Sequence, residues 1–196
     1  MARKVIGVVL DNAPIVLVLA SGRGERFRAA GGTGAKLQAD LAGQTVLART
    51  LAAVAGSGLR WHLEDAGHPG MGDSIAAAVR ATSAAPGWLV LPGDLPLVLP
   101  DTLRRVAHAL AAPVQAVQPV YRGERGHPVA FAGACGEALA ALTGDRGAHG
   151  VLKTLREAGR VAQIEVDDAG IVTDVDTPEA LAAAARLLAA RASCAS

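Results

Sequence analysis

The chain has 196 residues, so we expect a single domain over residues 1–196 with its core at about 15–190. Hydrophobic residues make up 51% of it, which excludes a disordered protein, whereas the aromatic share of 3% argues against stacking platforms for single-stranded nucleic acid. The net charge of +1 provides no overall field for DNA or an anionic membrane. We therefore predict neither nucleic acid nor a membrane as a partner.

The cysteines and the N-terminal segment bear on the compartment. Cys135 and Cys194 lack the spacing of metal ligands, which favours a reducing environment. The apolar run after the basic first residues is too short for a signal peptide, and none approaches the ~18 residues of a membrane span. These observations predict a cytoplasmic protein.

Short apolar runs alternate with Ala/Leu-rich helical stretches along the chain. We expect strands at Ile15–Leu19, Arg60–Leu63, Trp88–Leu91, Val114–Tyr121, Pro128–Phe131, Val161–Val166 and Ile171–Thr173. We expect helices at Val46–Ala55, Asp73–Ala81, Asp101–Leu110, Gly136–Leu142, Ala148–Glu157 and Pro178–Ala192, and a hairpin turn at Asp167–Gly170. The early alternation predicts an α/β protein with a mostly parallel sheet, and the later, closely spaced strands predict one antiparallel addition.

The first strand ends in a Gly-rich loop, Leu19-Ala-Ser-Gly-Arg-Gly-Glu-Arg26, with Lys36 ten residues later. Free backbone N–H groups in such a turn form an anion site, and Arg and Lys suit phosphate as a planar fork and a point charge. The alternatives are a turn whose arginines only face solvent, and a dinucleotide fold. The second is disfavoured because Phe27 replaces the third glycine of the G-x-G-x-x-G pattern.

Aspartates follow two later strands. Asp94 stands in Pro-Gly-Asp-Leu-Pro directly after Trp88–Leu91, where a carboxylate is placed to hold Mg²⁺ against phosphates, or simply to close a turn. Asp174 and Asp176 follow Ile171–Thr173, and Asp176 is a candidate second metal ligand or a helix cap.

Three further loops carry polar residues beside glycines. Ser74 opens a helix and could meet a base edge, bind an anion or cap the helix. His127 could face an acceptor substrate or be a turn residue held by Pro128, and Asp145 could be a ligand or a cap.

In this order the motifs resemble the MobA-like nucleotidyltransferase family, and within it most nearly the molybdenum cofactor cytidylyltransferases. The resemblance covers roughly residues 15–188. Its motifs are Leu19–Gly22 with Arg26 and Lys36, then Gly93–Pro96, Arg125–Val129, Gly144–Ala148 and Asp174–Glu179. Each motif is weak alone, but five in this order are specific.

The resemblance implies a three-layer, Rossmann-like nucleotidyltransferase. It implies transfer of CMP from CTP, with Mg²⁺, to a phosphorylated acceptor, the molybdopterin cofactor, and release of pyrophosphate by a monomer or small homo-oligomer. Lys36 would act at the α-phosphate, and Asp94 with Asp176 would hold Mg²⁺. Arg26 and the loop would hold the other phosphates, and the implied nucleotide-binding residues are Leu19, Ala20, Ser21, Gly22, Arg23, Gly24, Ser74 and Asp94. His127 and Asp145 would contact the acceptor. A transferase with another acceptor, such as a sugar phosphate, and a catalytically weak nucleotide-binding module remain alternatives.

Three features depart from the family pattern. Ser21 stands where cytidylyltransferases usually have Ala and guanylyltransferases Gly, so it does not decide between CTP and GTP. The loop from Arg26 to Lys36 is a few residues longer than usual. The segment 58–70 lacks one βα unit, so we expect Arg60–Leu63 directly beside the first strand, with Asp65 as a substitute contact to the base.

Overall fold

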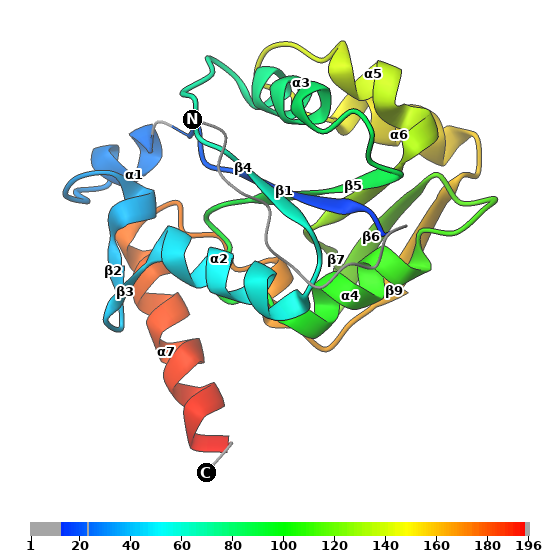
Figure 1. Cartoon of the computed structure of the whole chain (residues 1–196). Coiled ribbons are helices and arrows are strands. Elements are labelled where there is room, and N and C mark those ends of the chain that lie inside the picture. The colour runs from blue at the N-terminus through cyan, green and yellow to red at the C-terminus, as the bar shows by residue number, and fades with distance from the viewer. Residues whose placement is uncertain (1–12, 23, 195–196) are drawn as a thin grey trace.

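The computed structural model describes residues 13–22 and 24–194 (Figure 1). Its main sheet has seven strands in the order β4-β1-β5-β8-β6-β7, with β9 paired to β6. These strands are β1 (Ile15–Leu19), β4 (Trp61–Glu64), β5 (Gly87–Pro92), β6 (Ala116–Tyr121), β7 (Glu124–Arg125), β8 (Val129–Ala132) and β9 (Val161–Glu165). A separate small ribbon joins β2 (Asp40–Leu41) to β3 (Gln44–Thr45).

Six of the seven helices in the described ranges lie close to their expected places, and the first, Glu25–Ala29, was not expected. The seven helices are α1 (Glu25–Ala29), α2 (Val46–Ser57), α3 (Met71–Ala81), α4 (Pro100–Ala109), α5 (Gly136–Ala140), α6 (His149–Glu157) and α7 (Pro178–Cys194). Short 3₁₀ turns are η1 (Lys36–Gln38), η2 (Gly133–Cys135) and η3 (Ala169–Ile171). No helix in the described ranges is long and apolar enough to cross a membrane.

The pairing confirms the predicted mixed sheet. Strand β1 pairs in parallel with both β4 and β5, and β6 pairs in parallel with β9. Strand β8 is antiparallel to both β5 and β6, and β7 is antiparallel to β6. The βαβ half and the antiparallel addition are therefore both present.

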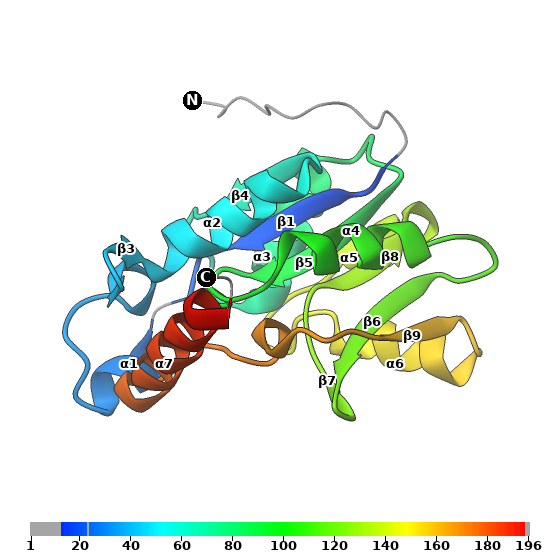
Figure 2. The same cartoon turned by 90° about the horizontal axis from the view of Figure 1, so that it is seen from below.

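Alternate residues of the central strands face opposite helical layers. In β1, Leu17 packs in a cluster with Ile75 of α3 and Leu139 of α5, whereas Val16 packs in a second cluster with Leu103 of α4. Period-two alternation in a nearly continuous apolar strand is what a sheet covered on both faces requires. Figures 1 and 2 show α3, α5 and α6 on one face, and α2 and α4 on the other.

A third cluster joins the opening loop to the end of the chain. Phe27 of α1 and Leu37 of η1 are buried with Val175 and with Ala184 of α7. Both views show α1 beside the start of α7 (Figures 1 and 2). Phe27, which argued against a dinucleotide fold, therefore packs against the C-terminal helix and brings the loop toward the last aspartate motif.

The expected strand at Ile171–Thr173 and the hairpin turn at Asp167–Gly170 are wrong. The chain instead forms η3 (Ala169–Ile171). Asp168 is buried, and its carboxylate accepts hydrogen bonds from backbone N–H groups and from Arg191 at 2.9 Å. A side chain that binds nearby N–H groups competes with strand pairing, which explains the difference.

The expectation for the shortened segment is confirmed. Strand β4 lies at the end of the sheet order directly beside β1, with Glu64 opposite Leu19. The strand starts at Trp61, one residue later than expected. The carboxyl end of the edge strand therefore lies beside the start of the Gly-rich loop.

Candidate active site

A cavity of about 840 Å³ lies beyond the carboxyl ends of β1 and β5, where parallel sheets usually bind ligands. Most of the residues predicted from the sequence line it: Leu19, Ser21, Gly22, Gly24, Arg26, Lys36, Ser74, Asp94, His127, Asp145 and Asp176. Ala20 and Asp65 do not line it, and Arg23 falls outside the described residues. The N–H of Ala20 is donated to the Glu64 carbonyl at 2.8 Å, which extends the strand pairing and removes that group from the predicted phosphate cradle.

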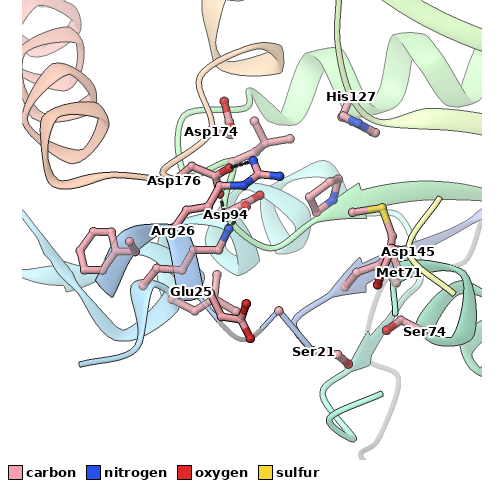
Figure 3. A pocket seen from close by; sticks show the side chains of 18 of the residues that line it. Ser21, Glu25, Arg26, Met71, Ser74, Asp94, His127, Asp145, Asp174 and Asp176 are labelled. Carbon is pink, nitrogen blue, oxygen red and sulfur yellow. Dashed lines mark hydrogen bonds and ion pairs between the residues drawn. The ribbon is translucent and has the colours of Figure 1, made fainter. Parts of the chain in front are cut away.

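Four charged side chains, those of Arg26, Lys36, Asp94 and Asp176, line the cavity, and Figure 3 labels Arg26 and the two aspartates. Lys36 donates to Asp94 Oδ2 at 2.5 Å and to Asp176 Oδ1 at 2.6 Å. Arg26, which is 84% exposed, donates to the other oxygen of Asp176 at 2.7 Å. The structure thus gathers both predicted phosphate-binding cations and both predicted metal ligands in one cluster.

Close backbone contacts at the strand ends position Lys36 and Asp94. Gly93 donates its N–H to the Leu19 carbonyl at 2.8 Å, and a Cβ at Gly93 would lie 3.0 Å from that oxygen. Gly24 has φ +62°, a conformation that glycine adopts without strain, and it lies against the backbone and side chain of Lys36. The glycines of both motifs therefore let the cation and the carboxylate approach.

The last aspartate motif is fixed to the metal motif by the backbone. Val175 donates its N–H to the Asp94 carbonyl at 3.0 Å, which places Asp176 beside Asp94. Thr177 Oγ1 accepts the N–H of Ala180 at 3.1 Å and so caps α7. Because Thr177 serves as the cap, the carboxylate of Asp176 is left for Lys36 and Arg26.

The charges in this cluster stabilise one another. Burial alone would lower the pKa of Lys36, but Asp94 and Asp176 outweigh it and hold this pKa above its usual 10.5. Burial likewise favours the neutral form of Asp176, but Lys36 and then Arg26 hold its pKa below the usual 3.8. Both side chains are therefore charged at neutral pH.

The carboxylates fit a divalent cation. Asp94 Oδ1 is buried and has no hydrogen-bond partner among the described residues, and Asp94 and Asp176 both accept from the same atom, Lys36 Nζ. No group of three or more His, Cys, Asp or Glu side chains in the described ranges could hold a metal ion. Two carboxylates without a full cage suit Mg²⁺, which usually takes one or two protein carboxylates together with substrate phosphates.

His127 forms part of a second wall. Burial lowers its pKa below 6.5 and outweighs the Val90 carbonyl and the charges of Asp94 and Asp174, so the imidazole is neutral at pH 7. His127 Nδ1 is buried without a partner among the described residues. Figure 3 shows Asp174 and His127 away from the side where Ser21 lies.

Asp145 and Ser74 lie at the start of α3. Gly144 donates its N–H to Asp73 Oδ2 at 3.0 Å and accepts from Gly72 at 2.7 Å, which brings the Gly144–Ala148 motif to that helix. Ser74 donates to the Gly70 carbonyl at 3.1 Å, and Gly70 holds the cap position, so Ser74 does not cap the helix. Asp145 therefore belongs to the α3 wall, and the two predicted acceptor contacts come from different elements.

Sequence reasoning missed the group at the end of β4. Glu64 is buried, and its carboxylate oxygens lie 3.4 Å from His62 Nε2 and 3.1 Å from His68 Nε2. His68 lines the cavity, and Ser21 Oγ donates to the Glu64 carbonyl at 3.3 Å. Polar residues at alternate positions in a short edge strand were the available signal.

The family of this chain is shown by its similarity to known proteins. Residues 16–162 match the family model of the MobA-like NTP transferase domain, and the chain belongs to that family. It is 34% identical over 125 residues to the purine catabolism protein PucB of Bacillus subtilis, a match covering 61% of this chain and 59% of PucB. The match thus spans less than two thirds of that relative's length.

Solved structures share the fold. Rv0371c from Mycobacterium tuberculosis superposes with a TM-score of 0.71 at 23% identity, covering 91% of this chain and all of the other. The same mycobacterial protein has also been solved as a complex with manganese. A nucleotidyl transferase from Methanothermobacter thermautotroptrophicus gives a TM-score of 0.69 at 22% identity, covering 88% of this chain and 95% of the other. These likenesses confirm the predicted nucleotidyltransferase-like α/β fold.

Proposed function

We propose that this chain acts as one nucleotidyltransferase domain that uses Mg²⁺ to transfer CMP from CTP to a phosphorylated acceptor, the molybdopterin cofactor. The observation that carries the proposal is the convergence of Lys36 and Arg26 on Asp94 and Asp176 in a member of the MobA-like family. The motifs Arg125–Val129 and Gly144–Ala148 favour this acceptor, and CTP is proposed because the motifs most nearly resemble those of the cytidylyltransferases. The cytoplasm is the proposed compartment.

The reaction joins an acceptor phosphate oxygen to the α-phosphorus of the nucleotide and releases pyrophosphate. Its main obstacle is repulsion between anions, so positioning and charge neutralisation dominate. Lys36 would leave its carboxylate partners and donate hydrogen bonds to the α-phosphate instead. Arg26, which is exposed, would bind the outer phosphates. Asp94 and Asp176 would hold Mg²⁺, which when bound neutralises phosphate charge as a Lewis acid.

Calorimetric or dye-based melting tests nucleotide binding directly. We would measure the midpoint with CTP, GTP, ATP and NAD, each with and without Mg²⁺, because a ligand of the native state raises the midpoint by mass action. A shift with CTP that requires Mg²⁺ is expected. Stabilisation by NAD alone would overturn the proposal.

Pyrophosphate release tests catalysis. CTP, Mg²⁺ and molybdopterin cofactor should yield pyrophosphate, whereas a sugar phosphate should not. Binding of CTP without release with any acceptor would instead favour a catalytically weak nucleotide-binding module. The presence of Lys36, Asp94 and Asp176 in one cluster supports the enzyme, since a binding module does not need both transfer and metal groups.

A further inference from the structure

The end of β4 contains a buried carboxylate with an unusual set of partners. Glu64 is 8% exposed, and in the described ranges its ion-pair partners are His62 and His68, with no Lys or Arg. The N–H of Ala66 also donates to Glu64 Oε1, at 3.3 Å. A buried carboxylate is costly unless it is hydrogen-bonded, so Glu64 is held by these groups and in turn fixes their orientation.

The contact to Glu64 engages one of the two ring nitrogens of His68, a residue that lines the cavity. His68 Nε2 lies 3.1 Å from Glu64 Oε1, so Nε2 carries the hydrogen. In the neutral imidazole Nδ1 is then a hydrogen-bond acceptor, and no partner for it occurs among the described residues. Ser21 donates its own hydrogen to the Glu64 carbonyl, which leaves lone pairs on its oxygen. This wall therefore presents acceptors and is complementary to a donor.

The remaining surroundings suit a nucleobase. Met71 is 46% exposed and lines the same cavity with Pro69, which provides apolar surface beside the polar groups. The phosphate-binding cations lie at the cluster of Asp94 and Asp176. Figure 3 shows Ser21 and Met71 on a different side of that cluster from Asp174.

We propose that His68, oriented by Glu64, reads an exocyclic amino group of the nucleobase through Nδ1. This inference rests on the proposed function. It specifies that the substrate base has an amino group where the rejected base has a carbonyl: cytosine rather than uracil, adenine rather than hypoxanthine, or guanine rather than xanthine.

The test compares dissociation constants, by titration calorimetry with Mg²⁺, within three matched pairs: CTP with UTP, ATP with ITP, and GTP with XTP. The protein should bind the amino member of its preferred pair about tenfold more tightly, since the oxo member leaves an acceptor facing a carbonyl. His68→Ala should bring that ratio close to one. The matched control is His62→Ala, because His62 contacts the same carboxylate but does not line the cavity, and it should retain the ratio.

Every result of this comparison either supports or overturns the role of His68. The ratio is taken within one variant, so a general loss of stability affects both nucleotides alike. An unchanged ratio in His68→Ala overturns the role of His68 and leaves the proposed function standing. Tighter binding of the oxo member of the preferred pair by the unmodified protein overturns the role of His68, and where UTP binds more tightly than CTP it overturns the proposed use of CTP as well. Failure of the unmodified protein to bind any nucleotide overturns both. If His62→Ala loses the ratio of dissociation constants to the same extent, the Glu64 carboxylate acts through the fold. That result also overturns the proposal that His68 reads the base.

Discussion

Replacing Lys36 with Met separates its structural role from its role in turnover. The substitution keeps a long apolar stem but leaves Asp94 and Asp176, now without the ammonium between them, facing each other. Removing one member of a buried ion pair costs about 3–5 kcal/mol. The Asp94 side chain is 15% exposed and that of Asp176 26%, and Asp176 keeps Arg26, so solvent and Arg26 offset part of this. We expect a loss of about 2–3 kcal/mol in the free energy of unfolding, or roughly 5–10 °C in the melting midpoint.

The matched control is Lys153→Met. Lys153 pairs with Glu157 at 3.8 Å on the surface and is 67% exposed, so its removal should change the free energy of unfolding by less than about 1 kcal/mol. Adding Mg²⁺ should raise the midpoint of Lys36→Met more than that of either the unmodified protein or the control. In Lys36→Met, Mg²⁺ binds the two carboxylates without first displacing an ammonium group, so its binding stabilises this variant more than the unmodified protein.

The stability difference has a defined pH dependence. Because the pKa of Asp176 is held below 3.8, its stabilisation is present above that pH and is lost as pH falls through the lowered value. Because the pKa of Lys36 is held above 10.5, its stabilisation is present below that pH and is lost as pH rises through the raised value. The difference between the unmodified protein and Lys36→Met should thus be nearly constant from about pH 5 to 9 and shrink below about pH 4.

Turnover provides the second measurement. Loss of one preorganised charge at a transition state costs about 10²–10³ in rate, so pyrophosphate release by Lys36→Met should fall at least that far. Near-normal release would refute the assignment of Lys36 to the α-phosphate. An unchanged midpoint, or no extra response to Mg²⁺, would refute the electrostatic account of the cluster.

Three further substitutions test other parts of the fold and site. Asp94→Asn should weaken Mg²⁺-dependent nucleotide binding about tenfold or more by calorimetry, because an amide is a poor ligand for Mg²⁺, while binding without Mg²⁺ should not weaken. Asp168→Ala should lower the free energy of unfolding by about 3–5 kcal/mol in urea titration, because it leaves Arg191 and two backbone N–H groups without their partner. Gly126→Ala would place a Cβ 2.4 Å from the Ile171 carbonyl oxygen, so thermal melting should show a lower midpoint. An unchanged midpoint would show that this turn yields easily.

Most of the fold was accessible from the sequence because its strands are apolar and end at recognisable loops. Strand β1 was predicted to the residue, and β5 and the helices other than α1 came within a few residues, whereas α1 was not predicted. The error at Ile171–Thr173 has a tertiary cause. A short apolar run there packs beside Asp168, whose partners include Leu99 and Arg191, which lie 69 and 23 residues away. No local pattern reveals such contacts.

The candidate site, too, could be predicted from the sequence only in part. Motifs after the strands predicted Lys36, Arg26 and Asp94 at one edge of the sheet, because parallel strands bring their carboxyl ends together. Asp176 was expected there from its own motif, but it follows η3 rather than a strand, and the N–H of Val175 on the Asp94 carbonyl places it. The sequence did not reveal that the cations would bind the carboxylates themselves in the ligand-free protein. Lys36 and Asp94, whose side chains are 12% and 15% exposed, neutralise each other because they are largely withdrawn from water, whereas Arg26 is exposed. Nucleotide and metal binding must therefore exchange these contacts, so measured affinities include the cost of separating Lys36 from its partners.

The shortened edge bears on where base selection would take place. Since β4 lies beside β1, Glu64 is level with Leu19, and its carbonyl accepts from the loop at Ser21. The residues after β4 then form the wall next to the phosphate loop. Asp65 was expected to compensate for the absent βα unit, but it does not line the cavity, whereas His68 does. If His68 reads the base, the shortened segment has moved base selection to the loop after β4. Ser21, which alone does not decide between CTP and GTP, then acts together with His68, because both side chains contact Glu64.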